Sequence, residues 1–285
     1  MKQFNKITII GVGLIGGSIG LAIKKNRLAR EVTGVFRRKS TLKKAIVRRA
    51  VDRGVLDIKS GVRDADLIIV ATPVYKIPML IEESARYAKD GAVITDAGST
   101  KEWIVRKAEK SCKGLPVSFV GAHPMAGSEH AGVEFARPDL FNGASCIIIR
   151  TKSTNPGALN KLVSFWKAIG ARVKVMNPSA HDKSVAFVSH LPHVAAFSVA
   201  GVVNDSDLEY AAEGFRDTTR VASSDPYLWA DIFMTNRKEL LASLRLFERY
   251  NRELASAVSK KDYKKLVTLL AKAKAKRDKL ARYEK

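Results

Sequence analysis

A glycine-rich turn near the N-terminus constrains the fold more than any other feature of this sequence. The run Gly11-Val-Gly13-Leu-Ile-Gly16 follows a short apolar strand pattern and opens a helical one, and this context makes an otherwise weak spacing informative. Gly11 permits a tight turn, Gly13 lets a pyrophosphate approach the backbone, and Gly16 lets helix and strand pack closely. Because a helix start offers unbonded N–H groups, we expect a dinucleotide to contact Gly11, Gly13, Leu14, Ile15 and Gly16.

The residues after the second predicted strand, 32–36, indicate which dinucleotide binds. NAD-binding folds carry an acidic residue there, about 20 residues further on, that bonds the ribose 2′-hydroxyl. This chain has Arg37, Arg38, Lys39 and Ser40 instead, and no carboxylate. Guanidinium groups bind phosphate through paired hydrogen bonds, whereas an acid repels it. We therefore predict that NADP is preferred to NAD through Arg37, Arg38 and Ser40; the alternative is that these cations are ordinary surface charges.

Strand and helix patterns alternate over the first part of the chain, which indicates a mainly parallel sheet with helices on both faces. After Asn177 no convincing strand pattern occurs, and apolar residues recur at helical spacing. We predict a Rossmann-type, doubly wound α/β domain at 1–176, which binds the dinucleotide, and an all-helical domain at 177–285. Thr72 and Pro73, which follow a strand, are further expected cofactor contacts. The expected strands lie at 6–10, 32–36, 67–71, 92–95, 119–121, 146–150 and 172–175. The first expected helix follows the glycine turn and ends at 24–26, and the others in this domain lie at 41–53, 77–87, 101–110 and 158–169.

The helical domain begins with a long apolar stretch near Val185–Val203. It has too few polar residues for a surface helix, so we expect it to be buried centrally and to pack against a second subunit. His190, Pro192 and His193 interrupt the stretch, and no apolar run approaches the about 18 residues that span a bilayer. The sequence therefore argues against a membrane segment.

The chain of 285 residues carries 50 Lys and Arg against 28 Asp and Glu, a formal net charge of +22. Such an excess is found in proteins that bind nucleic acid, that attract small anions, or that only have a heavily solvated surface. The stretch 259–285 contains eleven of the cations, but Leu266, Leu269, Leu270 and Ala273 give it a helical apolar stripe without a base-stacking pattern. We interpret this stretch as a surface helix with a basic face rather than a nucleic-acid site.

Cysteine usage and the start of the chain bear on the compartment. Cys112 and Cys146 are too few for a disulfide scaffold or a multi-cysteine zinc site. The apolar strand pattern begins close to Met1, so we expect no signal peptide. The sequence predicts a cytoplasmic protein without a bound metal.

Two motifs that follow predicted strands suggest the chemistry. Asp96-Ala-Gly-Ser99 and Gly121-Ala-His123-Pro lie where open α/β sheets bind ligands. An imidazole at such a place is a candidate general acid or base. Ser99 is a candidate N-cap of the helix that follows.

The helical domain contributes further polar residues. His190 and His193 are three apart and share a helical face, but no Cys or carboxylate nearby in sequence favours a metal site. His190 is alternatively a satisfied buried histidine. Asp217 is either a pocket residue or an ion-pair partner of Arg216 or Arg220. His181 with Asp182 we interpret as a feature of a helix start.

Taken in order, these motifs, with Gly127-Ser-Glu129, Arg216-Asp217-Thr-Thr-Arg220 and Asp225-Pro-Tyr-Leu-Trp229, resemble those of the prephenate dehydrogenase family, which includes arogenate dehydrogenases. The resemblance covers nearly the whole chain. It implies a dinucleotide-binding domain, a helical dimerisation domain and oxidative decarboxylation of prephenate in tyrosine biosynthesis. By resemblance, His123 accepts the proton of the ring hydroxyl, and Ser99 supports His123 and the nicotinamide end of the cofactor. Arg220 holds a carboxylate, and His190 and His193 contact the substrate side chain. Glu129, Asp217 and Trp229 line or close the pocket.

Other readings remain open. The sequence does not separate prephenate from arogenate. A β-hydroxyacid dehydrogenase or imine reductase has a similar layout, but those hydroxyacid enzymes use a helix-borne lysine where this chain has Ser189-His190-Leu-Pro-His193. A non-enzyme that senses NADP and binds nucleic acid through its basic C-terminal helices would not need His123, Ser99 and Arg220 together.

Overall fold

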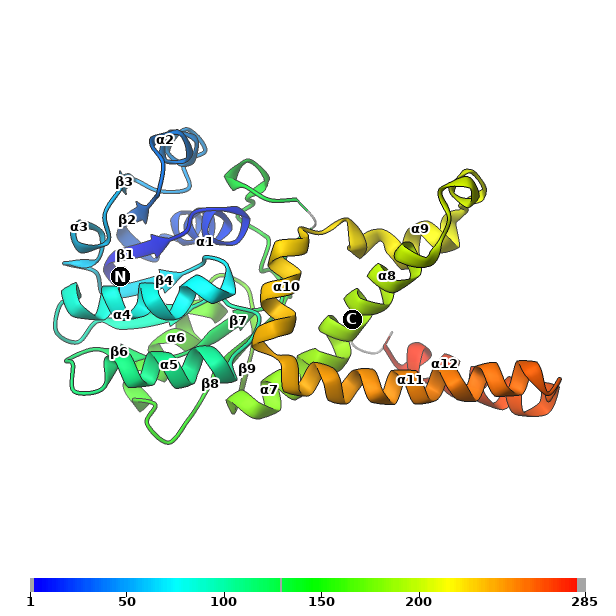
Figure 1. Ribbon diagram of the computed structural model, residues 1–285. Coiled ribbons are helices and arrows are strands. Elements are labelled where there is room, and N and C mark those ends of the chain that lie inside the picture. The colour runs from blue at the N-terminus through cyan, green and yellow to red at the C-terminus, as the bar shows by residue number, and fades with distance from the viewer. Residues whose placement is uncertain (1–2, 129, 281–285) are drawn as a thin grey trace. The chain divides into compact units, whose positions relative to one another are not determined.

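A computed structural model describes residues 3–128 and 130–280 of the chain (Figure 1). By internal contacts the chain forms two compact units, Met1–Arg237 and Lys238–Lys285. The first unit extends beyond residue 176, because helices that follow this position pack against the sheet region. The change from mixed to helical structure at 176–177 and the division into compact units are therefore different boundaries.

The first unit is built on a six-stranded sheet in which every neighbouring pair of strands is parallel, in the order β3-β2-β1-β4-β5-β6. This order is that of a doubly wound dinucleotide-binding fold, with a switch point between β1 and β4 where ligands bind at the carboxyl ends of the strands. The predicted fold class is confirmed. The strands are β1 Phe4–Ile10, β2 Ala29–Val35, β3 Arg53–Val55, β4 Leu67–Val70, β5 Val93–Asp96 and β6 Ser118–Phe119.

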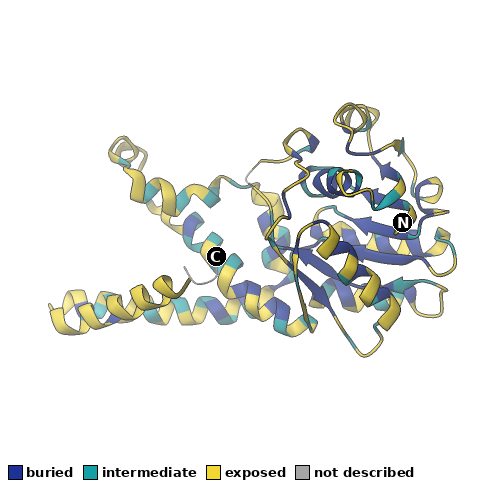
Figure 2. Cartoon of the chain, turned by 180° about the vertical axis from the view of Figure 1, so that it is seen from behind, coloured by how far each residue is buried: buried dark blue, intermediate teal, exposed yellow. Residues whose placement is uncertain are grey.

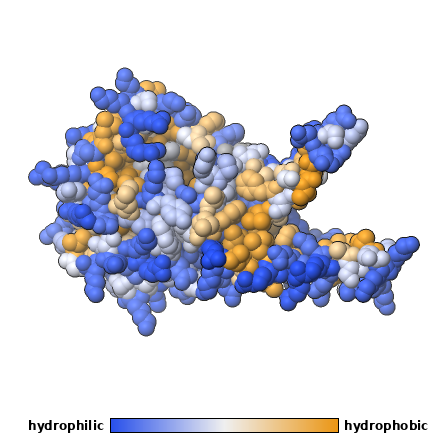
Figure 3. Space-filling view, viewed as in Figure 1, coloured by the Kyte–Doolittle hydropathy of each residue, from blue (hydrophilic) through white to orange (hydrophobic). Residues whose placement is uncertain are grey.

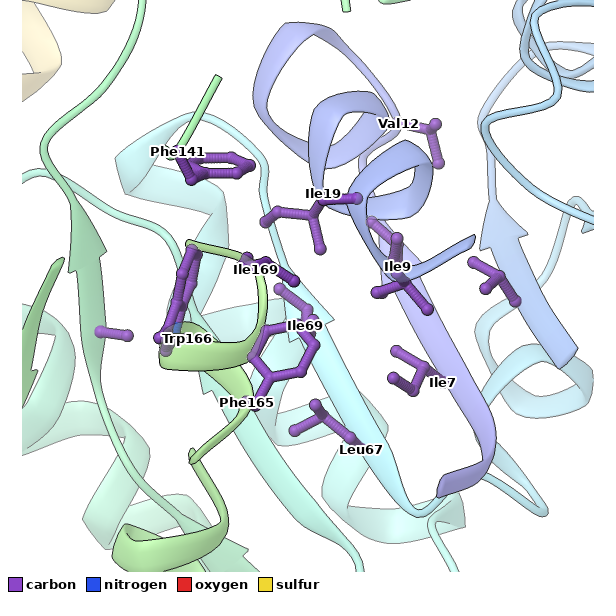
Figure 4. Close-up of a cluster of buried hydrophobic side chains, with 14 of the residues drawn as sticks. Ile7, Ile9, Val12, Ile19, Leu67, Ile69, Phe141, Phe165, Trp166 and Ile169 are labelled. Atoms are coloured by element: carbon purple, nitrogen blue, oxygen red, sulfur yellow. The ribbon is translucent and has the colours of Figure 1, made fainter. Parts of the chain in front are cut away.

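Helices cover both faces of this sheet, and alternate residues of the strands point to opposite sides. On one side Ile7, Ile9 and Leu67 pack with Phe165 and Trp166, as Figure 4 shows. On the other side a second cluster buries Ile10, Ile68 and Ile94. The helices, with one short 3-10 turn, are α1 Leu14–Lys25, α2 Lys39–Val47, α3 Ile58–Val62, η1 Val74–Lys76, α4 Ile77–Tyr87, α5 Glu102–Cys112 and α6 Pro156–Ala168.

A second, three-stranded sheet was not expected. In it β7, Ala122–Pro124, pairs antiparallel with β8, Ser145–Ile149, and β8 pairs parallel with β9, Arg172–Met176. The strand patterns near 146–150 and 172–175 are correct, but they do not extend the large sheet. The sequence also missed β3, and α2 ends at Val47 rather than at residue 53.

No strand occurs among described residues after β9, in agreement with the predicted all-helical region. A continuous helical segment runs through α7, Pro178–Val185, a π-helical turn η3, Ala186–His190, and α8, Leu191–Val202. Short elements follow, namely η4 Asp205–Tyr210, α9 Glu213–Thr219, η5 Arg220–Ser223 and α10 Pro226–Thr235.

The expectation that the apolar segment is centrally buried is wrong for the single chain. In α8 only Ala196 is buried, while Val199 and Val202 are 37% and 80% exposed. Apolar side chains gather on the surface over α8 (Figure 3), and exposed residues run along it (Figure 2). By length and composition alone Pro178–Val202 could span a bilayer, with a mean hydropathy of 1.5 over its best window, so the statement that no apolar run approaches that length is also wrong.

The second unit contains α11, Arg237–Ser259, and α12, Tyr263–Leu280. The hydroxyl of Tyr250 donates a 2.7 Å hydrogen bond to the carbonyl of Leu269, which joins the two helices. Leu269 is the one buried residue of α12, and the Lys and Arg side chains along the helix are exposed. Within the described residues, α12 is therefore the basic surface helix that the sequence predicts, and 281–285 of the predicted stretch lie outside them.

Candidate active site

The glycine turn has the geometry that a bound pyrophosphate requires. Gly11 has a φ of +91°, and a Cβ there would lie 2.7 Å from the carbonyl oxygen of Ala71. A Cβ on Gly16 would lie 2.1 Å from the carbonyl oxygen of Gly11, which explains the close packing of α1 on β1. A Cβ on Gly13 would meet nothing within 4 Å. The turn is therefore tightly packed at Gly11 and Gly16 and open at Gly13. At Gly13 the unbonded amides at the start of α1 can meet a phosphate.

The neighbouring strand ends complete this edge of the sheet. Thr72 follows β4, and its buried hydroxyl has no hydrogen-bond partner among the described residues. Pro73 is exposed and caps η1. Arg37, Arg38 and Ser40 follow β2 and are exposed, with Arg38 at the N-cap of α2. The residues that the sequence assigns to a dinucleotide thus lie at the carboxyl ends of adjacent strands, and the orphaned Thr72 hydroxyl fits a polar ligand.

His123 lies on β7, opposite Ile147 of β8, and is 9% exposed. Its Nδ1 is 2.8 Å from Nε2 of His181, and Nδ1 of His181 is 2.7 Å from Oδ1 of Asp182. Burial, followed by the positive charges that His181, Lys101 and His190 can carry, holds the pKa of His123 well below its ordinary 6.5. His123 is therefore neutral at pH 7, as a general base must be.

Asp182 joins α7 to the start of α5. Its Oδ1 accepts a 2.7 Å hydrogen bond from the backbone N–H of Lys101, and its Oδ2 accepts a 2.8 Å bond from that of Glu102. Such bonds satisfy the free amides of a helix start and place a carboxylate at its positive end. His181 and Asp182 do not cap their own helix, because Asn177 caps α7. The interpretation of the pair as a feature of a helix start holds only for Asp182, and for α5 instead of α7.

A buried ion pair links the ends of β5 and β7. The ammonium of Lys101 bonds to Oδ2 of Asp96 and donates a 2.9 Å hydrogen bond to the carbonyl of Ala122. Asp96 also accepts hydrogen bonds from the backbone N–H of Gly98, at 2.9 Å, and of Ala122, at 3.3 Å. These contacts fix the chain immediately before His123.

Ser99 lies between Asp96 and Lys101 in the sequence and is half-buried. It makes no side-chain bond to His123 in the described structure, where Nδ1 of that ring contacts His181 instead. It does not cap α5 either, since Asp182 bonds the first amides of that helix. Support of His123 by Ser99 remains a prediction.

A second cluster lies on η3, α8 and α10. The ring of His193 stacks on Trp229 with centroids 3.5 Å apart, and its Nδ1 donates a 2.8 Å hydrogen bond to the carbonyl of Ser189. Trp229 is buried. Burial lowers the pKa of His193, the Ser189 bond opposes this, and the charge of Arg220 lowers it further. The structure thus brings His193, Trp229 and Arg220 together.

His190 is only partly satisfied. The amide nitrogen of Asn236 donates to the carbonyl of Asp182 at 2.8 Å and contacts Nδ1 of His190 at 3.2 Å. Because an amide nitrogen donates, Nδ1 of His190 accepts and its proton lies on Nε2, which is buried and has no partner among the described residues. Burial lowers the pKa of His190 to about 4, so the ring is neutral.

The two clusters share one region. Trp229 and Ile232 of α10 pack into the core cluster that contains Ile77 and Ile94, and the hydroxyl of Thr100 contacts that of Thr235 at 3.0 Å. The helix that bears Trp229 therefore lies against the sheet edge of the glycine turn. Asp217 is exposed on α9, and Glu129 lies outside the described residues. No group of three His, Cys, Asp or Glu in the described ranges could hold a metal ion.

Sequence reasoning missed several residues of this network. Lys101 and Asn236 are buried polar groups that contact the site from other elements. His181 and Asp182 were singled out only as a feature of a helix start, without a link to His123. The one available signal was a His-Asp pair beside a long apolar helix, where polar side chains need partners.

Two family models match the chain. The nucleotide-binding domain of prephenate dehydrogenase matches residues 19–175, and the prephenate dehydrogenase dimerization domain matches residues 177–272. Prephenate dehydrogenase of Bacillus subtilis (strain 168) is 35% identical over 279 residues, which cover 95% of this chain and 75% of that protein.

Solved structures agree with these matches. The crystal structure of prephenate dehydrogenase from A. aeolicus in complex with hydroxyphenyl propionate and NAD+ has a TM-score of 0.89 at 29% identity and covers 97% of this chain and 98% of that one. Synechocystis arogenate dehydrogenase has a TM-score of 0.82 at 30% identity and covers 96% of this chain and 99% of that one. With the fold, the glycine turn and the buried histidines in place, the chain belongs to the prephenate dehydrogenase family of oxidoreductases.

Proposed function

We propose that the protein is an NADP-preferring prephenate dehydrogenase of tyrosine biosynthesis, which converts prephenate to 4-hydroxyphenylpyruvate and carbon dioxide. The observation that carries this proposal is the neutral, buried His123, whose Nδ1 is bonded to His181 and whose Nε2 is left for a substrate. A nicotinamide bound at the glycine turn would accept the hydride from the carbinol carbon of the substrate. Nε2 of His123 would take the hydroxyl proton as that carbon gains carbonyl character and the carboxylate departs as carbon dioxide, and it would return this proton to the oxygen of the aromatic product.

Aromatisation of the ring favours this reaction, so the protein needs mainly to position the reactants and to supply one base. Arg220 is proposed to hold a substrate carboxylate through paired hydrogen bonds. The protonated, unpartnered Nε2 of His190 is suited to donate a hydrogen bond to an oxygen of the substrate side chain. Because the proton of His193 lies on Nδ1, Nε2 of that ring is available as an acceptor. Trp229 fixes the ring of His193 by stacking. Ser99, Glu129 and Asp217 are proposed to line the same pocket.

The preference for NADP rests on the turn after β2. Arg37, Arg38 and Ser40 are exposed at the carboxyl end of that strand, and this stretch offers no carboxylate that would repel a 2′-phosphate. The A. aeolicus relative was crystallised with NAD+. The cofactor choice is therefore a property in which this chain is proposed to differ from that relative.

We also propose a cytoplasmic homodimer assembled through the helical region. The exposed apolar face of α8 and the match to a dimerization domain support this arrangement. Val202→Asp would place a charge on that face, and we expect it to shift the protein toward monomers in sedimentation at micromolar concentration. Val47→Asp is the matched control, because Val47 on α2 is equally exposed, at 80%. A dimer that survives Val202→Asp, together with Val199→Asp, would contradict an interface on α8.

The second candidate is an arogenate dehydrogenase, favoured by the similarity to the Synechocystis enzyme. The test is a two-by-two assay of reduced cofactor formation, with prephenate or arogenate and with NADP or NAD. Turnover with prephenate and NADP is expected to be fastest. Turnover with arogenate alone would retain the mechanism and change the substrate, whereas no turnover in any combination from folded protein would contradict the enzyme assignment. Absence of turnover would instead favour a dinucleotide-sensing protein that binds nucleic acid.

A further inference from the structure

The contacts behind His123 determine where its proton lies. Both oxygens of Asp182 accept hydrogen bonds from backbone N–H groups, from Lys101 to Oδ1 and from Glu102 to Oδ2. A carboxylate that accepts from fixed donors is an acceptor for its third contact as well. Nδ1 of His181, 2.7 Å from Oδ1, must therefore carry a proton and donate it to Asp182.

The next contact follows from the chemistry of a neutral imidazole, which has one N–H and one acceptor nitrogen. Burial is the main cause that lowers the pKa of His181, against the opposing effect of Asp182, so that ring is neutral. With the proton on Nδ1, Nε2 of His181 is an acceptor. Nδ1 of His123, 2.8 Å away, must then be the donor, which leaves Nε2 of His123 without a proton.

We propose that His181 and Asp182 are positioning residues that hold His123 in the tautomer with its proton on Nδ1, so that Nε2 accepts the proton of the substrate. This inference rests on the proposed role of His123 as the base. Neither residue touches the substrate in this proposal. Each acts through the ring of His123, as an orienting group acts on a catalytic histidine.

The same chain of contacts also stabilises the product of proton transfer. When Nε2 of His123 takes a proton, the new imidazolium is disfavoured first by its burial and then by the positive charge of Lys101. The charge of Lys101 is offset by its buried partner Asp96. Through its hydrogen bond to His181, His123 is connected to the carboxylate of Asp182, which partly compensates the unfavourable surroundings.

The test compares two substitutions of His181. His181→Phe keeps a ring of similar size but removes the acceptor nitrogen, whereas His181→Gln can present its amide oxygen near the position of Nε2. We expect His181→Phe to lower kcat by about 10- to 100-fold with KM changed by less than about threefold, because a base in the wrong tautomer can lose up to about 10⁴-fold. His181→Gln should restore most of kcat.

A purely structural role of His181 would not give this pattern. Nitrogen-15 NMR of the histidine rings in the wild-type protein should find His123 protonated on Nδ1 and unprotonated on Nε2, and His181→Phe should give a mixture of tautomers. In a His123→Asn background, adding His181→Phe should cause no further loss of kcat. Thermal unfolding and dinucleotide binding serve as controls for the fold.

Asp182→Asn gives an independent test if His181→Phe does not fold. An amide can donate to Nδ1 of His181 and so reverse both tautomers, although the loss of one bond to α5 should also lower stability. A wild-type His123 protonated on Nε2, or an unchanged kcat and pH profile in His181→Phe, would overturn the inference. The NMR measurement needs no substrate, so a correct tautomer in a protein without turnover would remove the proposed function and leave the positioning intact.

Discussion

Two parts of the candidate site differ in how their side chains are held. At the end of β5 and on β7, His123, Asp96 and Lys101 are buried, and each is bonded to a neighbour from another segment. At the end of β2, Arg37 and Arg38 are exposed and belong to a local turn. For the proposed reaction the first part needs fixed geometry, because proton and hydride transfer depend on positions within a fraction of an ångström. As the proposed contact for a 2′-phosphate, the second part needs only positive charge.

The difference predicts how each part responds to substitution. In the buried part a change in one residue leaves its partners unsatisfied, and this is costly in a low-dielectric surrounding. In the exposed part water replaces a lost contact, so effects should be smaller and specific to the ligand. Substitutions in each part therefore test whether the buried and the exposed residues differ in this way.

The largest effect is expected for His123→Asn. Loss of the general base should lower kcat by about 10² to 10⁴-fold, with little change in dinucleotide binding. The measurement is steady-state turnover with the best pair of substrate and cofactor. His130→Asn is the matched control, because His130 is exposed and should retain full activity. Equal effects of both changes would show that His123 is not the base.

The next effect concerns the cluster on α8 to α10. Arg220→Met should lower kcat/KM by about 100-fold, mostly by raising KM, because a charge-assisted pair of hydrogen bonds to a carboxylate is lost. Arg216→Met, four residues earlier on α9 and also exposed, is the control. If Arg220→Met lowered kcat at unchanged KM, Arg220 would act on the transition state rather than on binding.

A smaller effect is expected in the exposed turn. Arg37→Asp should lower the ratio of kcat/KM for NADP to that for NAD by about tenfold, since an acid repels the 2′-phosphate and can bond a ribose hydroxyl. Lys43→Asp makes the same change of charge on an exposed residue of α2 and should leave the ratio unchanged. If both substitutions shift the ratio equally, the effect is that of net charge and not of a specific contact.

The two parts were also not equally accessible from sequence. The glycine turn and Arg37 lie within a short stretch of chain. Their local pattern was enough to predict the strand, the turn and a dinucleotide ligand, whereas the preference for NADP stays a prediction. His123 could be named from its position after a strand and from the family resemblance. Its partners His181 and Asp182 are 58 and 59 residues further on, and spacing alone cannot bring them together. Likewise, apolar composition predicted that α8 is covered, but a single chain does not bury it.

The smallest expected effect is on pH dependence, and it separates a buried base from an exposed one. The pKa of His123 is held well below 6.5, mainly by burial, so the free protein should keep its base neutral and kcat/KM should fall by less than about twofold from pH 8 to pH 6. An imidazole with the ordinary pKa near 6.5 would lose about fourfold over the same range.

Stability must be followed in parallel by circular dichroism. The unfolded chain takes up a proton on His190 below about pH 6.5, but the folded chain does so only near its pKa of about 4. The free energy of unfolding should therefore decrease as the pH falls from 6.5 toward 4. A fourfold loss of kcat/KM by pH 6 in protein that is still folded would mean that the base is not held by the buried network. His123 would then behave like an exposed residue, and the contrast between the buried and the exposed part of the site would not hold for it.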